Sequence, residues 1–218
     1  RVTRAITRPL EDAVSAADSI ADGNWDTEIG SDSRDETGHL IRAIRKMRDS
    51  LKTRTEADRR QERIKNQLAE LNALLRGEMT LEQLGRNLLG YLVPTLEAQV
   101  GAFYAFDQEA GTLRLSSAYA MQRRKQLANE FALGESLVGQ CALEKKSIVL
   151  EEVPEDYMVV GSGTGKAVPR NVVVLPVIHE DELKGVLEIG SFQPLSDAEL
   201  QFLEQGAAVI AVALHSAQ

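Results

Sequence analysis

The 218-residue sequence lacks a long hydrophobic run and has few aromatic residues and a single cysteine. A membrane-spanning helix needs about 20 mostly apolar residues, and no stretch reaches that length, nor is there a signal-peptide pattern. The lone Cys141 excludes an internal disulfide and fits a reducing compartment. The net charge of -8 argues against nucleic-acid binding, which needs a basic surface. The hydrophobic share of 43% nevertheless suffices for a buried core.

Charge is distributed unevenly along the chain. Residues 1–65 hold 14 basic and 13 acidic residues, whereas residues 66–218 hold 11 basic and 20 acidic residues. The apolar pattern and the aromatic content also change between residues 55 and 90. We therefore predict two units joined by a charged helix.

The first unit is predicted to begin with an amphipathic helix. Its apolar residues recur at spacings of four, three, four and three, the narrow seam of a coiled coil rather than the broad stripe of a globular helix. Pro9 lies near the expected start, where a first helical turn tolerates proline. The seam residues are Ile6, Leu10, Ala13, Ala17 and Ile20.

A connector rich in Gly, Asn, Asp and Ser follows this helix and breaks the helical pattern. Its only large apolar residues are Trp25 and Ile29, and we expect them to pack onto the helices because nothing else would order a connector of this length. The alternative leaves both exposed in a loop. The second helix then has a seam of Leu40, Ile44, Met47 and Leu51.

The stretch DETG stands at the expected start of the second helix. A carboxylate from Asp35 or Glu36 would meet free N–H groups and the positive end of the helix dipole there. Gly38 permits a close backbone approach or an unusual dihedral angle. Taken alone, this arrangement is an ordinary helix cap.

Two such short helices cannot bury a core alone, whereas two copies of the unit would form a parallel four-helix bundle. In this respect residues 3–53 resemble the HAMP family of bacterial receptors, through the early proline, the connector IADGNWDTEI and the stretch DETG. Trp25 departs from the family pattern, which more usually has a smaller aliphatic residue. The resemblance implies a signal-relay domain over residues 1–53, in which the signalling residues are Pro9, Asp35, Glu36 and Gly38.

The same resemblance implies a place in the cell. HAMP domains follow a transmembrane helix, so the start of the sequence is expected to be the cytoplasmic end of an inner-membrane anchor. Arg1, Arg4 and Arg8 fit the basic cytoplasmic flank of such an anchor. Solvated charges on a helix are the alternative interpretation.

Residues 54–76 are predicted to form a coiled-coil linker helix, because the segment is rich in helix formers and its seam returns at Ile64, Leu68, Leu71 and Leu75. A disordered charged tether is the alternative. The returning seam is three residues late relative to Leu51, which predicts a packing discontinuity between residues 52 and 63.

The second unit, residues 77–218, alternates helices with two strand hairpins. Its predicted order is a helix, two strands, helices, one strand, two strands and a helix, so we expect an α+β fold with a mostly antiparallel central sheet. The stretches GESLVGQCALEKKSIVLEEV, VVVLPVIHEDELKGVLEIGSF and LSDAELQFLEQGAAVIAVAL resemble the GAF family. Such domains bind small molecules between sheet and loops, or bind nothing and serve as dimerising relays.

Three features of the sequence bear on possible chemistry. VGSGTGKAVPRN lacks the first glycine and the final Ser or Thr of a phosphate-binding loop and is interpreted as a loop over a pocket mouth. Cys141 is interpreted as a buried inert thiol rather than a cofactor attachment point or redox sensor. His39, His179 and His215 offer no metal-ligand spacing, no catalytic constellation stands out, and no cofactor is predicted.

A ligand pocket is expected to be lined by residues of the sheet and its loops. Core packing is the alternative for the aliphatic candidates, whereas Tyr119, Tyr157 and Glu188 carry polar groups that need partners. The ligand-binding candidates are Phe103, Tyr104, Tyr119, Leu137, Tyr157, Val174, Pro176 and Glu188.

Together these observations predict the cytoplasmic part of a membrane sensor. It would be a homodimer through the HAMP and linker helices, would relay a signal without catalysis, and could take a small-molecule ligand. The sequence AVALHSAQ resembles the exit from GAF domains into coiled coils of hybrid histidine kinases, so a histidine kinase is the expected output. The alternatives are a diguanylate cyclase output and a small-molecule-binding enzyme domain with a dimerising arm.

Overall fold

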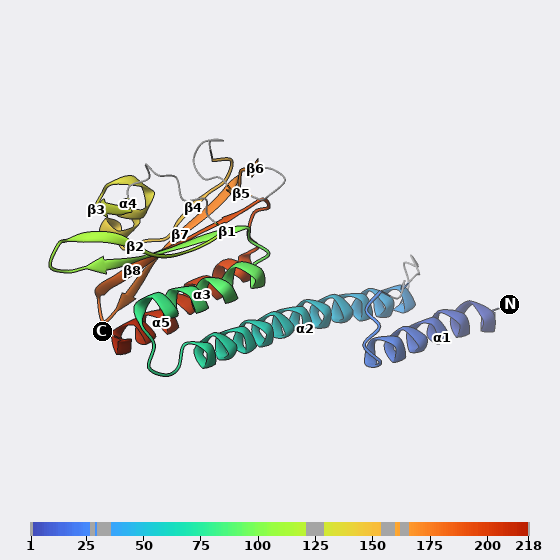
Figure 1. Ribbon diagram of the computed structural model, residues 1–218. Helices are drawn as coiled ribbons and strands as arrows, with labels where there is room; N and C mark the ends of the chain where they lie inside the picture. Colours follow the sequence, from blue (N-terminus) through green and yellow to red (C-terminus); the bar gives the residue numbers. More distant parts are fainter. Residues whose placement is uncertain are drawn as a thin grey trace. The chain divides into compact units, whose positions relative to one another are not determined.

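A computed structural model describes residues 2–26, 29, 36–120, 129–153, 160–161 and 166–217 (Figure 1). The chain divides into two compact units, Arg1–Arg63 and Ile64–Gln218, and each is described by itself. The predictions for Tyr157 and Asp35, and for a helix directly after the first hairpin, fall outside the described residues.

The first unit consists of α1 (Val2–Ala21), a connector and the first part of α2 (Glu36–Leu74). A small apolar cluster joins the two helices and the connector. Trp25 and Ile44 pack against it, and Ile29 is buried within it, which confirms that the connector packs onto the helices. The buried members of the cluster are Ala13, Ala16, Ile20, Ile29 and Ile41.

The predicted seam of α2 does not face α1 of the same chain. Leu40, Met47 and Leu51 are 42%, 46% and 38% exposed. Ile41 is fully buried instead, and only the half-buried Ile44 belongs both to the seam and to the cluster. Because successive residues of a helix are rotated by about 100°, the buried face lies beside the seam and leaves the seam open.

Pro9 was predicted to lie near the start of its helix. The structure differs, because α1 already begins at Val2 and Pro9 lies beyond the first turn. A proline beyond the first turn has no N–H to donate to the carbonyl of the residue four positions earlier. That residue is Ala5. Pro9 therefore removes one hydrogen bond from the helix and does not mark its start.

The connector is held onto α2 by polar contacts as well. Nε of Arg45 donates a hydrogen bond of 2.9 Å to the carbonyl oxygen of Ile29, and Nη2 of the same guanidinium donates a second one. Asp26 pairs with Nζ of Lys52 at 3.0 Å. The Asp26–Lys52 ion pair is exposed and contributes little to stability. Arg45, in contrast, satisfies the backbone carbonyl of Ile29, a residue whose side chain is buried.

The predicted linker helix is present as part of α2, which runs without interruption for 39 residues. It ends at Leu74, shortly before Gly77, whose φ of +106° suits glycine. Ile64, Leu71 and Leu75 lie in the core of the second unit, so this end of the helix is part of the second unit.

The second unit is built on a six-stranded sheet in the order β3-β2-β1-β8-β7-β4, and each neighbouring pair is antiparallel. This confirms the α+β class and the mostly antiparallel sheet. The strands are β1 (Val100–Asp107), β2 (Thr112–Tyr119), β3 (Glu130–Ala132), β4 (Ile148–Leu150), β7 (Asn171–His179) and β8 (Glu182–Ser191).

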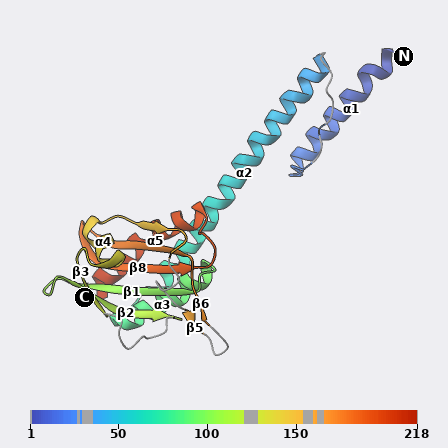
Figure 2. The same cartoon turned by 90° about the horizontal axis from the view of Figure 1, so that it is seen from above.

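Helices cover both faces of this sheet (Figures 1 and 2). One face packs on α3 (Leu81–Thr95) and α5 (Asp197–Ala217), and we call it the α3/α5 face. The other face packs on α4 (Ser136–Glu144), and we call it the α4 face. Each face has its own buried cluster, so neighbouring residues of a strand belong to different cores.

Ser196 caps the start of α5, because its hydroxyl accepts a hydrogen bond from the N–H of Glu199 at 3.4 Å. Strand β3 was not predicted, because three residues are too few for a periodic pattern. The segment expected to be only a loop contains the short strands β5 (Val160–Gly161) and β6 (Lys166–Ala167).

Candidate functional site

A buried polar pair lies on the α4 face of the sheet. The hydroxyl of Tyr104 donates a hydrogen bond to Oε2 of Glu188 at 3.3 Å, and Glu188 is 4% exposed. Glu188 stands opposite Ala102 on β1 and Val174 on β7, both of which belong to the α4-face cluster. A buried carboxylate on a central strand is costly unless it is hydrogen-bonded, and the hydroxyl of Tyr104 supplies such a bond.

The electrostatics of the pair keep the phenol protonated. Burial raises the pKa of Tyr104 well above its usual range, and the charge of Glu188 adds to the shift. The ring also packs edge-on against Phe131, with the ring centroids 5.7 Å apart. Tyr104 is therefore a fixed hydrogen-bond donor rather than an acid or a base.

The structure brings together some of the residues predicted to line a pocket and separates others. Tyr104, Val174 and Glu188 share the α4 face, and Leu137 of α4 packs against the same cluster. Phe103 is fully buried in the cluster of the α3/α5 face and so does not join them. Tyr119 stands opposite Gly101, whose space on that same α3/α5 face is bounded by Leu89 and Val93 of α3.

Cys141 lies in α4 and is completely buried, as predicted. Burial raises the pKa of the thiol to about 12, and the charge of Glu144 contributes a smaller part of the shift. A thiol nucleophile must ionise near neutral pH. Cys141 therefore packs as a small apolar residue and has no reactive environment.

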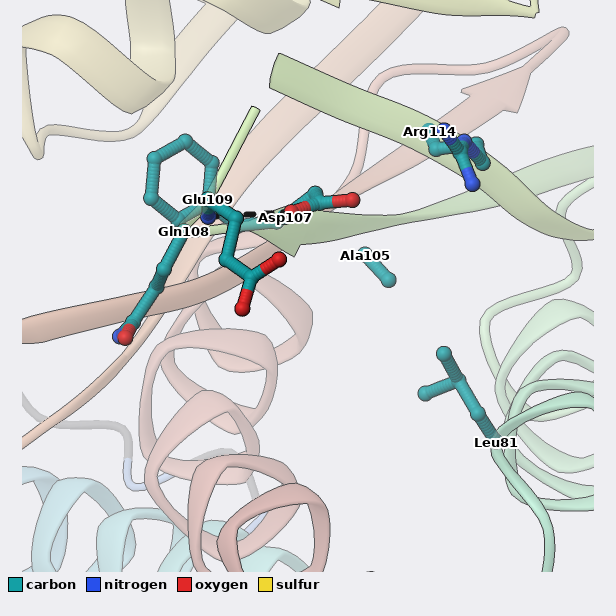
Figure 3. A pocket seen from close by; sticks show the side chains of 7 residues that line it. Leu81, Ala105, Asp107, Gln108, Glu109 and Arg114 are labelled. Carbon is teal, nitrogen blue, oxygen red and sulfur yellow. Dashed lines mark hydrogen bonds between the residues drawn. The ribbon is translucent and has the colours of Figure 1, made fainter. Parts of the chain in front are cut away.

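A groove that the sequence did not reveal lies on the other face, at the turn between β1 and β2 (Figure 3). Its volume is about 380 Å³. We call it the hairpin groove, because most of its lining comes from these two strands and their turn. The lining residues are Leu81, Ala105, Phe106, Asp107, Gln108, Glu109 and Arg114.

Two histidines far apart in sequence meet next to this region. The rings of His179, at the end of β7, and His215, in the last turn of α5, have centroids 4.5 Å apart. Glu182 stands opposite His179 and forms an ion pair of 2.9 Å with Lys184, which is 5% exposed. That pair, and to a smaller degree Gln108 and His215, lowers the pKa of Glu182.

This cluster does not form a metal centre. Among the described residues, no three His, Cys, Asp or Glu side chains gather closely enough to hold a metal ion. The same described part of the chain contains no helix with the length and hydropathy needed to cross a membrane.

Known families match both units. The GAF domain family matches residues 78–215, and the HAMP domain family matches residues 1–53. Among curated protein sequences, none matches this chain.

Solved structures share the fold of the second unit. The GAF domain of a phosphoenolpyruvate-protein phosphotransferase from Coxiella burnetii is 19% identical, with 71% of this chain and 94% of that chain covered and a TM-score of 0.59. The corresponding domain from Acinetobacter is 17% identical over 70% and 92%, with a TM-score of 0.58. Free methionine-R-sulfoxide reductase from Neisseria meningitidis, solved with its substrate, is 15% identical over 71% and 89%, with a TM-score of 0.56. Identities this low establish the fold alone.

Proposed function

Because the chain belongs to the GAF domain family and carries a HAMP domain ahead of it, we propose that it relays signals in a dimeric membrane sensor with a histidine kinase output. The order of the two domains indicates a signal-transduction module. The membrane anchor, the dimer and the kinase are the specific parts of the proposal.

The observation that carries the proposal is the open seam of α2. Leu40, Met47 and Leu51 are exposed on a helix that also supplies Ile64 and Leu71 to the core of the second unit. Large apolar side chains spaced by seven and four residues on one helix are the pattern that a second helix covers in a coiled coil. A second copy of the chain, aligned in parallel, would cover this seam.

The path of the relay is α2. The helix has no break over Glu36–Leu74, so a rotation or shift of the first unit would reach Ile64 and Leu71 through an unbroken hydrogen-bond ladder. Residues 52–63 of this helix contain no buried side chain in the single chain. They fit a weakly packed joint between two cores.

The output assignment rests on α5. This helix continues to Ala217 and so includes residues 211–217 of AVALHSAQ, the stretch that resembles the exit from GAF domains into kinase coiled coils. A diguanylate cyclase attached to the same module is the alternative output.

The basic residues Arg1, Arg4 and Arg8 support a cytoplasmic position next to a membrane anchor.

The rival function is an enzyme on the same fold, as the reductase relative illustrates. The chain's single thiol, Cys141, is buried with its pKa raised to about 12, which does not favour thiol chemistry. We propose that the unit catalyses no reaction and that Tyr104 and Glu188 contribute to ligand recognition on the α4 face.

Paired deletions in the intact receptor test the relay. Removing residues 54–60 shortens α2 by one heptad and keeps the phase of the seam, so the sign of the output should be preserved. Removing residues 54–56 changes the phase and should alter or invert the basal output. Equal behaviour of the two deletions would contradict a relay through helix phase.

Light scattering tests the dimer directly. The chain has a mass of 23.9 kDa, so a parallel dimer should scatter as about 48 kDa at micromolar concentration. Met47→Glu places a charge in the open seam and should yield the monomer. Lys46→Glu, off the seam, is the control and should leave the dimer intact. A wild-type monomer with intact helices would contradict the proposal.

A further inference from the structure

We propose that the hairpin groove binds a small zwitterion with an apolar side chain, of the size of a free hydrophobic amino acid. The site is distinct from the Tyr104–Glu188 pair because it opens on the α3/α5 face of the sheet. The proposal goes beyond the signalling function and does not depend on the identity of the output.

The floor of the groove is apolar. Leu81 from the first turn of α3 and Ala105 from β1 lie at the margin of the α3/α5-face cluster, whereas Phe106, which also borders the groove, packs its side chain against the α4-face cluster. The volume of about 380 Å³ lies at the lower end of the range for small-molecule sites. An amino acid side chain can fill such a floor, whereas a nucleotide-sized ligand would extend beyond it.

Opposite charges flank this floor on one face of the sheet. Arg114 stands opposite Ala105, and Asp107 stands two residues further along β1, opposite Thr112. Diagonal neighbours of this kind are separated by about 7–8 Å, which leaves room for a ligand between their charged ends. Figure 3 shows Arg114 on one side of Ala105 and the carboxylates of Asp107 and Glu109 on the other.

The two carboxylates nearest to Arg114 in the sheet, those of Asp107 and Glu130, accept hydrogen bonds from other groups. Oδ1 of Asp107 accepts hydrogen bonds from the N–H groups of Glu109 and Ala110, both at 3.1 Å. Glu130 lies opposite Arg114 on β3 but accepts a hydrogen bond of 2.6 Å from Thr112. Within the described residues, no ion pair of Arg114 is present, so its guanidinium is available for a ligand carboxylate.

The acidic side of the groove is suited to an ammonium group. Glu109 is exposed, and Gln108 beside it lies near Glu182 of β8 and contributes to lowering the pKa of that carboxyl group. The turn itself is held by the two hydrogen bonds that Asp107 accepts within it. A ligand with a carboxylate and an ammonium group would meet Arg114 at one end and Glu109 at the other.

Calorimetric titration of the full chain with L-phenylalanine, L-leucine and L-methionine tests the site. We expect saturable binding of at least one of them, with a dissociation constant on the order of 1 mM for so small a ligand. N-acetyl-L-phenylalanine and L-phenylalaninamide each lack one charge. Each should bind about tenfold or more weakly than phenylalanine, since each loses a charge-assisted hydrogen bond.

Variants locate the binding. Arg114→Gln and Glu109→Gln should each weaken binding about tenfold, because the first loses the carboxylate contact and the second the ammonium contact. Arg86→Gln is the matched control, because Arg86 is exposed on α3 and does not line the groove. Thermal melts that coincide with the wild type show that each variant is folded.

Three results would overturn the proposal. The first is the absence of saturable binding for all three amino acids up to about 20 mM. The second is equal affinity for phenylalanine and one of its blocked derivatives, which would indicate a site for a single charge. The third is binding that Arg114→Gln leaves unchanged or that Arg86→Gln weakens equally. None of these outcomes involves the receptor's output, so each leaves the proposed relay intact.

Discussion

The hydroxyl of Tyr104 on β1 and the carboxylate of Glu188 on β8 are joined by a hydrogen bond between two central strands, in a place that water hardly reaches. Removing the hydroxyl takes a donor away from a buried carboxylate. Tyr104→Phe should therefore lower the free energy of unfolding by about 1–3 kcal/mol, as measured by urea denaturation. Tyr119→Phe is the control and should change it little, because Tyr119 is 38% exposed. Equal effects of the two variants would show that the buried bond contributes nothing.

Ionisation of Tyr91 should lower the stability of the folded protein in alkaline solution. Its single hydroxyl hydrogen is shared between two acceptors, the carbonyl oxygen of Gln67 at 3.1 Å and Oε2 of Glu70 at 2.9 Å, which ties α3 to the end of α2. Desolvation and then Glu70 raise its pKa to about 12. An unfolded tyrosine ionises near pH 10, so this contribution is complete below about pH 10 and is lost as the pH rises towards 12. Chemical denaturation at stepped pH should show a shallower decline for Tyr91→Phe than for the wild type.

Cys141 should react with thiol reagents only when the protein opens. Its burial and its pKa of about 12 leave almost no thiolate at pH 8. The rate of colour release from a disulfide reagent should therefore follow the unfolding rate and rise with urea. Ser147→Cys in a Cys141→Ala background supplies an exposed comparison that should react at once. Fast labelling of the native wild type would disprove the inert thiol.

Two glycines should respond oppositely to a methyl group. A Cβ at Gly185 would lie 2.4 Å from the carbonyl oxygen of Tyr104 on the neighbouring strand, so Gly185→Ala should destabilise the sheet by about 1–3 kcal/mol. A Cβ at Gly90 in α3 would meet nothing within 4 Å. Gly90→Ala should raise stability by about 0.5–1 kcal/mol through its better helix propensity. Thermal denaturation of both variants checks the pair.

The hydrogen bonds from Arg45 should slow the local opening of the connector at Ile29. Arg45→Gln shortens the side chain and loses the fork that binds the carbonyl of Ile29, so amide hydrogen exchange in the peptide that contains Ile29 should accelerate about five- to tenfold. Lys46→Gln, one residue along on an exposed position, should leave the exchange unchanged. Identical exchange in the two variants would mean that apolar packing alone holds the connector.

The helices and strands with a clear apolar period could be predicted from the sequence. Which face of the sheet each strand residue points to could not be predicted. The two hairpins and the last helix followed from apolar patterning and turn residues. The continuous apolar run around Phe103 and Tyr104 carries no signal for which side chain faces which layer, so the predicted pocket mixed both faces. Short elements such as β3 were missed for want of a period.

The hairpin groove and the histidine pair escaped the sequence analysis for a different reason. Arg114 and Asp107 come together only through the register of β1 with β2, and His179 meets His215 only because α5 packs on β7. Neither relation leaves a spacing that can be recognised along the chain. The Tyr104–Glu188 pair was half predicted, because a glutamate within an apolar strand stands out while its partner's orientation does not.

The bond from Arg45 to Ile29 has a consequence for the engineering of chimeric receptors. The acceptor is a main-chain oxygen, which every amino acid provides. Position 45 therefore constrains the path of the connector without constraining which residue occupies position 29, provided that the residue can fill the buried space. Connector sequences grafted from other receptors should keep this anchor if Arg45 is retained. An exchange that preserves the graft but omits the arginine would lose the anchor without any visible change in the grafted segment.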